Sequence, residues 1–153
     1  MSTTDQASAR ADEAGALADP LHAIPFLRLL GARSGPAGDG RAELSLELRE
    51  ELLNSWGVGH GGVVMTLLDV AMARAGRTLA QADGRSGGSV TVEMKTTFFR
   101  PARGVVRAVG RVLQRSTTMS YCEAELLDEQ GALLAKASGT FKYLLRPTVA
   151  RKR

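Results

Sequence analysis

The stretch GGVVMTLLDVAMA, from Gly61 to Ala73, decides the fold class of this 153-residue chain. Every residue in it is apolar or glycine except Thr66 and Asp69, and Asp69 carries the only charge. A helix that is apolar nearly all round is usually buried inside a domain. We therefore expect one long central helix over about Gly61 to Ala80, with an aspartate in its apolar part.

Alternating apolar and polar residues predict strands on both sides of this helix. From Arg41 to Arg49 one face is apolar, which is the pattern of a half-buried strand. Ser89 to Phe99 alternates in the same way and is closed by Pro101. In this second strand one face would carry Val90, Val92, Met94, Thr96 and Phe98, and the other Thr91, Glu93, Lys95 and Thr97.

The second half of the chain predicts an antiparallel meander. Gly104 to Arg115 is ambiguous, because arginines at four-residue intervals would also line one face of a helix. Its glycines and valines disfavour a helix, and a strand gives it one small apolar face, so we predict a strand. Strands over Thr118 to Leu127 and Ala132 to Leu145 follow, joined by the hairpin sequence DEQG at 128–131.

The N-terminal part adds a short helix and completes the domain. DPLHAIPFLRLLG (19–31) predicts a helix with Asp19 as N-cap and Pro20 in its first turn, ending at Gly31, with Pro25 keeping it short or kinked. One buried helix and five to six antiparallel strands predict an α+β domain over residues 19–146, in which the sheet wraps around the helix. We expect residues 1–18 to be a disordered leader and 147–153 a basic tail.

The composition argues against several classes of protein. Apolar residues make up 44% and charged residues 24%, as in soluble domains, and no apolar run approaches the roughly 20 residues of a membrane span. The single cysteine, Cys122, cannot form an internal disulfide or a cysteine-based zinc site, so we expect a cytoplasmic protein without a metal. Aromatic residues at 5% and the absence of a recognised motif argue against nucleic-acid binding.

The net charge of +4 is modest, but arginines gather in one short region. Such a concentration of positive charge can attract a phosphate-bearing ligand, and a solvent-facing row is an equally good explanation. The residues are Arg100, Arg103, Arg107, Arg111 and Arg115.

Asp69 needs a physical reason for its place in an apolar helix. Burying an ionised carboxylate without partners costs several kcal/mol. A structural hydrogen bond at a break in the apolar face is one explanation, and a functional carboxylate is the other. The spacing alone leaves both open.

Glycines at the start of the helix favour the functional explanation. His60-Gly61-Gly62 directly precedes or opens the helix, so the N–H groups of Gly61 and Gly62 are expected among those left unpaired at its positive end. Such N–H groups can hold a developing oxyanion, and glycine lets a ligand carbonyl approach the backbone. Asp69 lies more than two helical turns beyond His60, too far for both to serve one small group within a subunit.

The order and spacing of several motifs resemble the PaaI-like acyl-CoA thioesterases of the hotdog fold. The pattern is Asn54-x-x-Gly57-x-x-His60-Gly61-Gly62, then Thr66-Leu67-x-Asp69-x-Ala71, then VTVEMKTTFFRPARG (90–104). The resemblance runs from about Leu21 to Leu145. It implies hydrolysis of aryl- or medium-chain acyl-CoA thioesters without a cofactor.

The resemblance also implies a role for each site residue. The acid at Asp69 would be the nucleophile or general base, and the Gly61 N–H would bind the thioester oxygen. Asn54 would position the nucleophile or water, His60 would support the loop, and Thr91 would help to hold the attacking water. In this family Asn54, His60 and Gly61 of one chain face Asp69 and Thr91 of another, which implies a homodimer and commonly a dimer of dimers.

Four further residues are expected to contact the substrate because of their positions in the sequence. We expect Gly62 and Thr66 to lie beside it, and Arg100 and Arg103 to contact the coenzyme A phosphates, since arginine suits phosphate recognition. Ordinary structural roles remain open for Asn54 as a turn residue, His60 as a loop histidine and Thr91 as a strand threonine. The alternative functions are a hotdog enoyl-CoA hydratase or dehydratase, and a non-catalytic acyl-CoA-binding protein.

Overall fold

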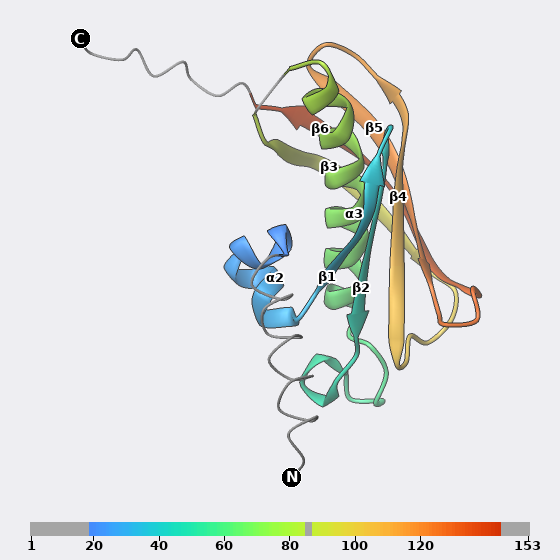
Figure 1. The fold of residues 1–153 in the computed structure, drawn as a ribbon. Helices are drawn as coiled ribbons and strands as arrows, with labels where there is room; N and C mark the ends of the chain where they lie inside the picture. Colours follow the sequence, from blue (N-terminus) through green and yellow to red (C-terminus); the bar gives the residue numbers. More distant parts are fainter. Residues whose placement is uncertain (1–18, 85–86, 145–153) are drawn as a thin grey trace, which may run out of the picture.

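The computed structural model describes residues 19–84 and 87–144, and the predictions for 1–18 and 147–153 lie outside these ranges. Six strands form one antiparallel sheet in the order β1-β2-β4-β5-β6-β3, and the long helix α3 lies against one face of it (Figure 1). The elements are η1 (Pro20–Ala23), α2 (Pro25–Leu30), β1 (Arg33–Gly38), β2 (Arg41–Glu47), η2 (Glu50–Leu52), α3 (Gly61–Ala82), β3 (Ser89–Phe98), β4 (Val105–Arg115), β5 (Met119–Leu127) and β6 (Leu133–Tyr143). The predicted α+β hotdog architecture is confirmed.

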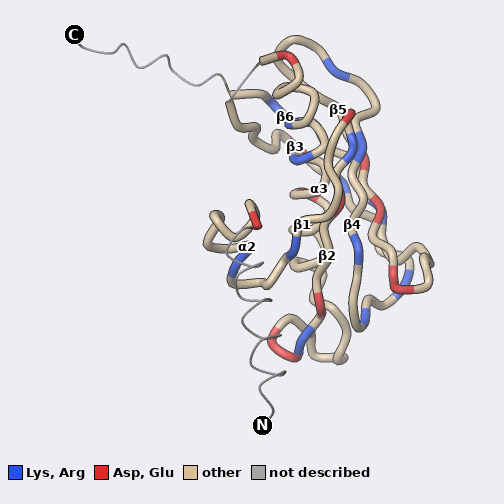
Figure 2. Tube along the Cα trace, viewed as in Figure 1, with Lys and Arg blue, Asp and Glu red and all other residues tan. Residues whose placement is uncertain are grey.

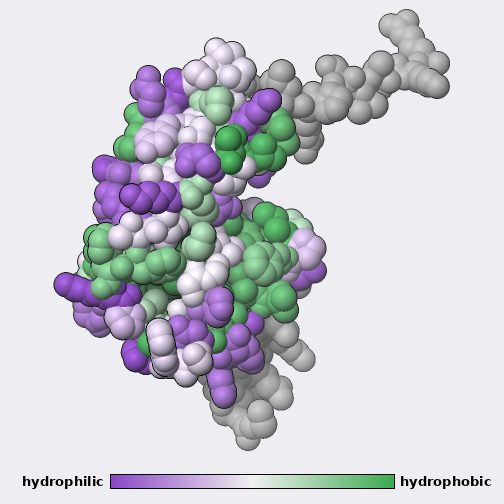
Figure 3. Space-filling view, turned by 180° about the vertical axis from the view of Figure 1, so that it is seen from behind, coloured by the Kyte–Doolittle hydropathy of each residue, from purple (hydrophilic) through white to green (hydrophobic). Residues whose placement is uncertain are grey.

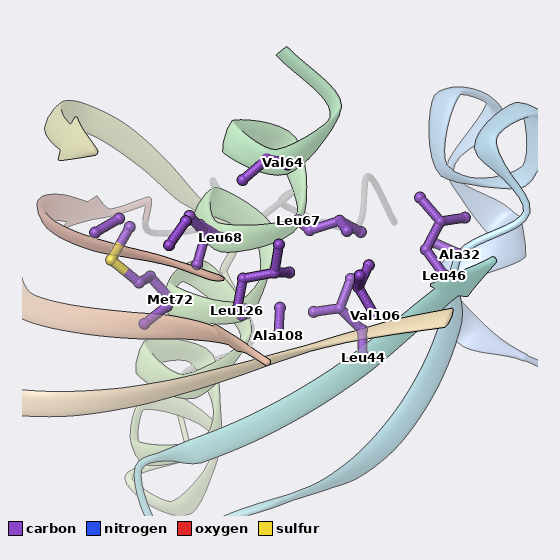
Figure 4. Packing of buried hydrophobic residues seen from close by; sticks show 14 of the residues in the cluster. Ala32, Leu44, Leu46, Val64, Leu67, Leu68, Met72, Val106, Ala108 and Leu126 are labelled. Atoms are coloured by element: carbon purple, nitrogen blue, oxygen red, sulfur yellow. The ribbon is translucent and has the colours of Figure 1, made fainter. Parts of the chain in front are cut away.

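The hydrophobic core lies between α3 and the sheet. Leu67, Leu68 and Met72 are completely buried on the sheet side of the helix. They belong to one buried cluster with Leu44, Val106, Ala108 and Leu126 on the strands, and Figure 4 shows part of this cluster. The core therefore fixes the position of α3 over the centre of the sheet.

The opposite face of α3 differs from the prediction. We expected a helix buried nearly all round, but Thr66, Asp69, Val70 and Ala73 are only partly buried, and Met65 is 38% exposed. This side faces away from the sheet, and the described part of the chain covers it incompletely. Some apolar residues of α3 are therefore not buried in the core of one chain.

Most of the predicted strands are present. Ala42, Leu44, Leu46 and Leu48 are buried as the alternation predicted, and β4, β5 and β6 form the predicted meander. The prediction missed β1, whose sequence RSGPAG has the glycine and proline of a loop. β1 lies at the sheet edge, and its register shifts between Ser34 and Ala37, which is where a proline is tolerated in a strand.

β3 does not continue the meander, because it pairs with β6 at the far edge of the sheet. Its register shifts between Thr91 and Glu93, so that Val92 is an extra residue. Thr91 then lies opposite the buried Phe141, and Thr96 lies opposite the buried Ala137. The prediction that put Thr91 on the face of Glu93 and Lys95 is therefore wrong, because the bulge turns Thr91 to the helix side.

The predicted N-terminal helix is present in two pieces. Asp19 caps η1 by accepting the N–H of Leu21 at 2.9 Å, and Pro25 begins α2, which ends at Gly31 with a φ of 80°. The Asp19 carboxylate also accepts the backbone N–H of Ser34 at 2.7 Å and its hydroxyl at 2.6 Å. These bonds tie η1 to β1. Burial raises the pKa of Asp19, but the hydrogen bonds from Ser34 and Leu21 outweigh it and hold the pKa below its usual range.

The helix and the sheet approach each other closely at Gly110 on β4. A Cβ atom at this position would overlap the carbonyl of Ala71 and lie 2.8 Å from the amide nitrogen of Met72. The α3 backbone therefore rests directly on the backbone of β4. No residue larger than glycine fits here without displacing the helix.

We expect Gly110→Ala to lower the free energy of unfolding by about 3 kcal/mol, because the added methyl group must push α3 from the sheet. Urea unfolding followed by circular dichroism measures this. Gly38→Ala is the matched control, since no atom lies within 4 Å of a Cβ at that position and its effect should stay within about 0.5 kcal/mol. Equal stability of the two variants would show that α3 does not need this contact.

Candidate active site

The loop before α3 is organised by the side chain of Asn54. Its Oδ1 accepts the N–H groups of Trp56 at 3.0 Å and Val58 at 3.4 Å, and its backbone N–H donates to the carbonyl of Val58 at 2.8 Å. Asn54 thus has the turn-forming role that the sequence left open. Within the described residues its side-chain NH2 group has no acceptor, so it remains available to a ligand.

His60 is the N-cap of α3. Its Nδ1 accepts the N–H of Gly62 at 2.9 Å, which requires an unprotonated Nδ1 and puts the proton of the neutral ring on Nε2. The expectation that the Gly62 N–H is unpaired is therefore wrong. Among the described residues the Gly61 N–H has no acceptor, so of the two glycine N–H groups it alone remains free to donate to a ligand.

A pocket of about 410 Å³ opens beside Gly61 at the N-terminal end of α3. Gly61, Asn54 and Arg100 lie along it, and the Phe98 ring stands 3.6 Å from where a Cβ of Gly61 would be. The sequence reasoning did not find Phe98 and Phe99 as lining residues, because side-chain alternation in β3 indicated only a sheet face. Most of the remaining lining is apolar, from Val58, Val64, Ala102, Leu126, Leu134 and Ala135.

Asp69 and Thr91 form the second part of the candidate site. The Thr91 hydroxyl donates to Asp69 Oδ1 at 2.7 Å. The bulge at Val92 makes this bond possible, because it turns Thr91 toward α3. The two residues that the resemblance places on the same chain are thus in contact within one chain, and Asp69 is only partly buried.

The two parts of the site stand apart on the same helix. Asp69 is eight residues beyond Gly61, which is about 12 Å along the helix axis. The structure therefore brings Asn54, His60 and Gly61 together at one end of α3, and Asp69 and Thr91 together near its middle. It does not bring the two groups together within one chain.

Two of the other predicted site residues, Thr66 and Arg103, make structural hydrogen bonds, and Arg100 does not. The Thr66 hydroxyl donates to the carbonyl of Gly62 at 2.8 Å within the helix. Arg103 Nη1 donates to the carbonyl of Gly57 at 2.9 Å and so holds the loop. The Arg100 side chain makes no hydrogen bond or ion pair to the described residues and lines the pocket.

The other arginines of the basic stretch pair with acids on the sheet and at the C-terminal end of α3. Arg107 pairs with Glu43 at 3.0 Å, Arg111 pairs with Glu123, and Arg115 pairs with Asp83 at 2.6 Å. Figure 2 shows the basic and acidic residues mixed along the strands. The description of a solvent-facing row therefore fits these three, and only Arg100 and Arg103 lie near the pocket.

Two further searches cover only residues 19–84 and 87–144. No group of three or more histidine, cysteine, aspartate or glutamate side chains there could hold a metal ion. No helix there is long and apolar enough to cross a membrane. Cys122 is buried, and burial raises the pKa of its thiol, which is the environment of a structural cysteine.

Residues 57–135 match the family model of the thioesterase superfamily, and the chain belongs to this superfamily. This span contains Gly61, Asp69 and Thr91. The match agrees with the hotdog architecture described above.

Individual relatives extend the similarity over most of the domain. The chain is 35% identical over 114 residues to the Saccharolobus solfataricus protein named "Putative esterase SSO2140", covering 74% of this chain and 78% of that one. The solved structure of conserved protein PA5202 from Pseudomonas aeruginosa is 37% identical with a TM-score of 0.72, covering 78% and 93%. A mutant structure of the phenylacetic acid degradation protein PaaI from Thermus thermophilus is 29% identical with a TM-score of 0.70, covering 78% and 99%. The resemblance to PaaI-like proteins is thus confirmed.

His60 offers a test of the helix cap. We expect His60→Ala to lower the free energy of unfolding by about 1 kcal/mol, because the Gly62 N–H loses its acceptor. His60→Asn should keep most of the stability, since asparagine is a good N-cap residue. Urea unfolding at pH 7 measures both, and an alanine variant as stable as the asparagine variant would contradict the capping role.

Proposed function

We propose that this protein hydrolyses acyl-CoA thioesters of the aryl or medium-chain class to the free acid and coenzyme A. The observation that carries the proposal is the pairing of the Asp69 carboxylate with the Thr91 hydroxyl at 2.7 Å. It is supported by the unpaired Gly61 N–H beside an apolar pocket. Membership of the thioesterase superfamily and the names of the relatives support the same class of reaction.

In the proposed mechanism the Gly61 N–H and the positive end of α3 polarise the thioester carbonyl. Asp69 either attacks the carbonyl carbon or removes a proton from a water molecule that attacks it. The Thr91 hydroxyl donates a hydrogen bond to Asp69, so its oxygen is free to accept a hydrogen bond from that water. When Asp69 acts as the base, the C–O bond to water forms, the C–S bond breaks, and the thiolate takes up the proton that Asp69 removed from the water. When Asp69 is the nucleophile, the same exchange gives an acyl–Asp69 anhydride and a thiolate that is protonated from solvent, and a water molecule then hydrolyses the anhydride to the free acid.

This mechanism needs two chains. Gly61 and Asp69 of one chain lie about 12 Å apart along α3, whereas an oxyanion and the nucleophile that attacks its carbon must lie within a few ångströms. A homodimer that places the α3 N-terminus of one chain against Asp69 of the other meets this requirement. We propose such a dimer, with assembly into a dimer of dimers as a further prediction.

The edge strand β3 is the surface on which this dimer would form. Val90 and Val92 on it are 43% and 55% exposed, so pairing along this edge would bury apolar surface. β3 also carries Thr91, so pairing along this edge would bring the second chain directly to Asp69. The incompletely covered face of α3 supports the same arrangement, because a partner helix would bury Met65 and Ala73.

The pocket beside Gly61 would hold the coenzyme A side of the thioester. Arg100 and the unbonded donors of Arg103 would contact its phosphates. Trp56 is 84% exposed at this pocket and offers a flat surface for the adenine ring. We propose that the reaction takes place in the cytoplasm. We infer no cofactor, since the proposed chemistry uses only Asp69, Thr91 and the Gly61 N–H.

We expect Asp69→Asn to lower kcat for phenylacetyl-CoA and hexanoyl-CoA by about 10² to 10⁴, because asparagine is neither a nucleophile nor a base. Release of free thiol measures the rate. Near-full activity of Asp69→Asn would contradict the mechanism, and hydration of an enoyl-CoA without thiol release would favour a hydratase.

One substitution can remove the Gly61 N–H while the backbone at the start of α3 keeps its conformation. Gly61→Pro deletes the donor at the first helical position, where proline is well tolerated, and we expect a loss of about 10² in kcat. Gly61→Ala is the matched control, since it keeps the N–H and its methyl group would lie 3.6 Å from Phe98, an ordinary contact. Equal rates for the two variants would rule out the amide as oxyanion donor.

A further inference from the structure

A second cavity, of about 390 Å³, lies between the N-terminal helical segment and the C-terminal half of α3. Its walls come from η1, from Ala37 on β1, from α3 and from Gly88 and Ser89 at the start of β3. Figure 3 shows hydrophobic surface on both sides of a hollow in this region of the molecule. The cavity is separate from the pocket beside Gly61, with which it shares no lining residue.

This cavity begins next to Asp69 and Thr91. Val70 follows Asp69 in the chain, and Ala73 lies one helical turn beyond it on the same side of α3. Ser89 lies opposite Tyr143 in the sheet, and Thr91 lies opposite Phe141, so both face the helix. A thioester carbonyl at Asp69 would therefore stand at the mouth of this cavity.

The lining is apolar near Asp69 and basic farther along. Leu21, Ile24, Val70 and Ala73 contribute apolar surface, and two arginines, Arg74 and Arg77, follow on α3. The helical rise places these arginines about 8 and 12 Å beyond Asp69 along the axis. An occupant with an apolar middle and a negatively charged end fits this arrangement.

The positive charge in this cavity is only partly compensated by the described residues. Neither Arg74 nor Arg77 forms an ion pair with them, and no lining residue is acidic. Arg74 Nη1 donates to the carbonyl of Glu43 at 2.7 Å, which fixes its direction without cancelling its charge. The nearby Asp19 carboxylate accepts hydrogen bonds from Ser34 and Leu21, keeps its negative charge and partly offsets the charge of Arg74. Two arginines without an ion pair, of which Arg77 is the less compensated, form a carboxylate-binding arrangement at the end of an apolar cavity.

On the basis of the proposed function, we propose that this cavity holds the acyl group of the thioester and that Arg74 and Arg77 bind a carboxylate at its far end. The preferred substrates would then be coenzyme A thioesters of dicarboxylic acids with a medium-length chain. Coenzyme A phosphates are a poorer occupant, because the apolar walls between Asp69 and the arginines suit methylene groups and would desolvate a phosphate. Arg100 and Arg103 stand at the other pocket to receive those phosphates.

The test compares adipyl-CoA with hexanoyl-CoA, which have the same chain length and the same coenzyme A and differ in the terminal carboxylate. We expect the wild-type protein to have the higher kcat/KM for adipyl-CoA. Arg77→Gln should lower the ratio of kcat/KM for adipyl-CoA over hexanoyl-CoA about tenfold, mainly through KM, because a charge-assisted bond in the substrate complex is lost. Arg77→Lys should recover part of the ratio.

Arg77 suits this test because it is exposed and makes no hydrogen bond to the described residues, so its loss should leave the fold intact. Arg41→Gln is the matched control, since Arg41 is also exposed but lies in β2, beside a separate pocket on the sheet, and it should leave the ratio unchanged.

The outcomes separate this inference from the proposed function. No thiol release from either substrate would mean that the proposed function is wrong. Hydrolysis of hexanoyl-CoA without preference for adipyl-CoA would overturn only the inference. An equal loss for both substrates in Arg77→Gln would also overturn it, because the arginine would then act on coenzyme A or on the chain itself.

Discussion

The geometry of this fold depends on the direct contact between the backbones of α3 and β4 at Gly110. This contact sets the height of the helix above the sheet, and the buried side chains of Leu67, Leu68 and Met72 then fix its rotation. With the helix held in this way, the Gly61 N–H opens toward one pocket and Asp69 faces Thr91 on the edge strand. The two halves of the candidate site are thus consequences of how one helix rests on one sheet.

The periodic pattern of apolar residues was sufficient to predict the helices and strands whose side chains form the core. The alternation of Ala42, Leu44 and Leu46 and the long apolar segment after Gly61 each predicted an element that the structure contains. Features that depend on contacts between distant segments could not be predicted from the sequence. The position of β3 beside β6 depends on contacts between distant segments, and β1 is stabilised as an edge strand in spite of its glycine and proline. Neither has a local signal strong enough to be read from the residues.

The candidate site, like the fold, was predicted only in part from the sequence. Asp69 was noticeable because it carries the only charge in an apolar segment, and the resemblance to PaaI-like thioesterases supplied its partner Thr91. The alternation of β3 by itself put Thr91 on the wrong face, since a bulge of one residue at Val92 is not visible in the pattern. The capping of Gly62 by the side chain of His60 was likewise hidden, because it depends on a rotamer. Phe98 and the arginines of the second cavity became site candidates only when the structure showed what surrounds them.

The central claim is that each active site combines the Gly61 N–H of one chain with Asp69 of another. The most direct measurement is to co-express Gly61→Pro and Asp69→Asn chains with different tags, purify the mixed dimer and measure thiol release. A site shared between chains predicts about half of the wild-type activity, because one of the two symmetric sites of the mixed dimer is assembled from the two intact halves. Activity no higher than that of either variant alone would contradict the account.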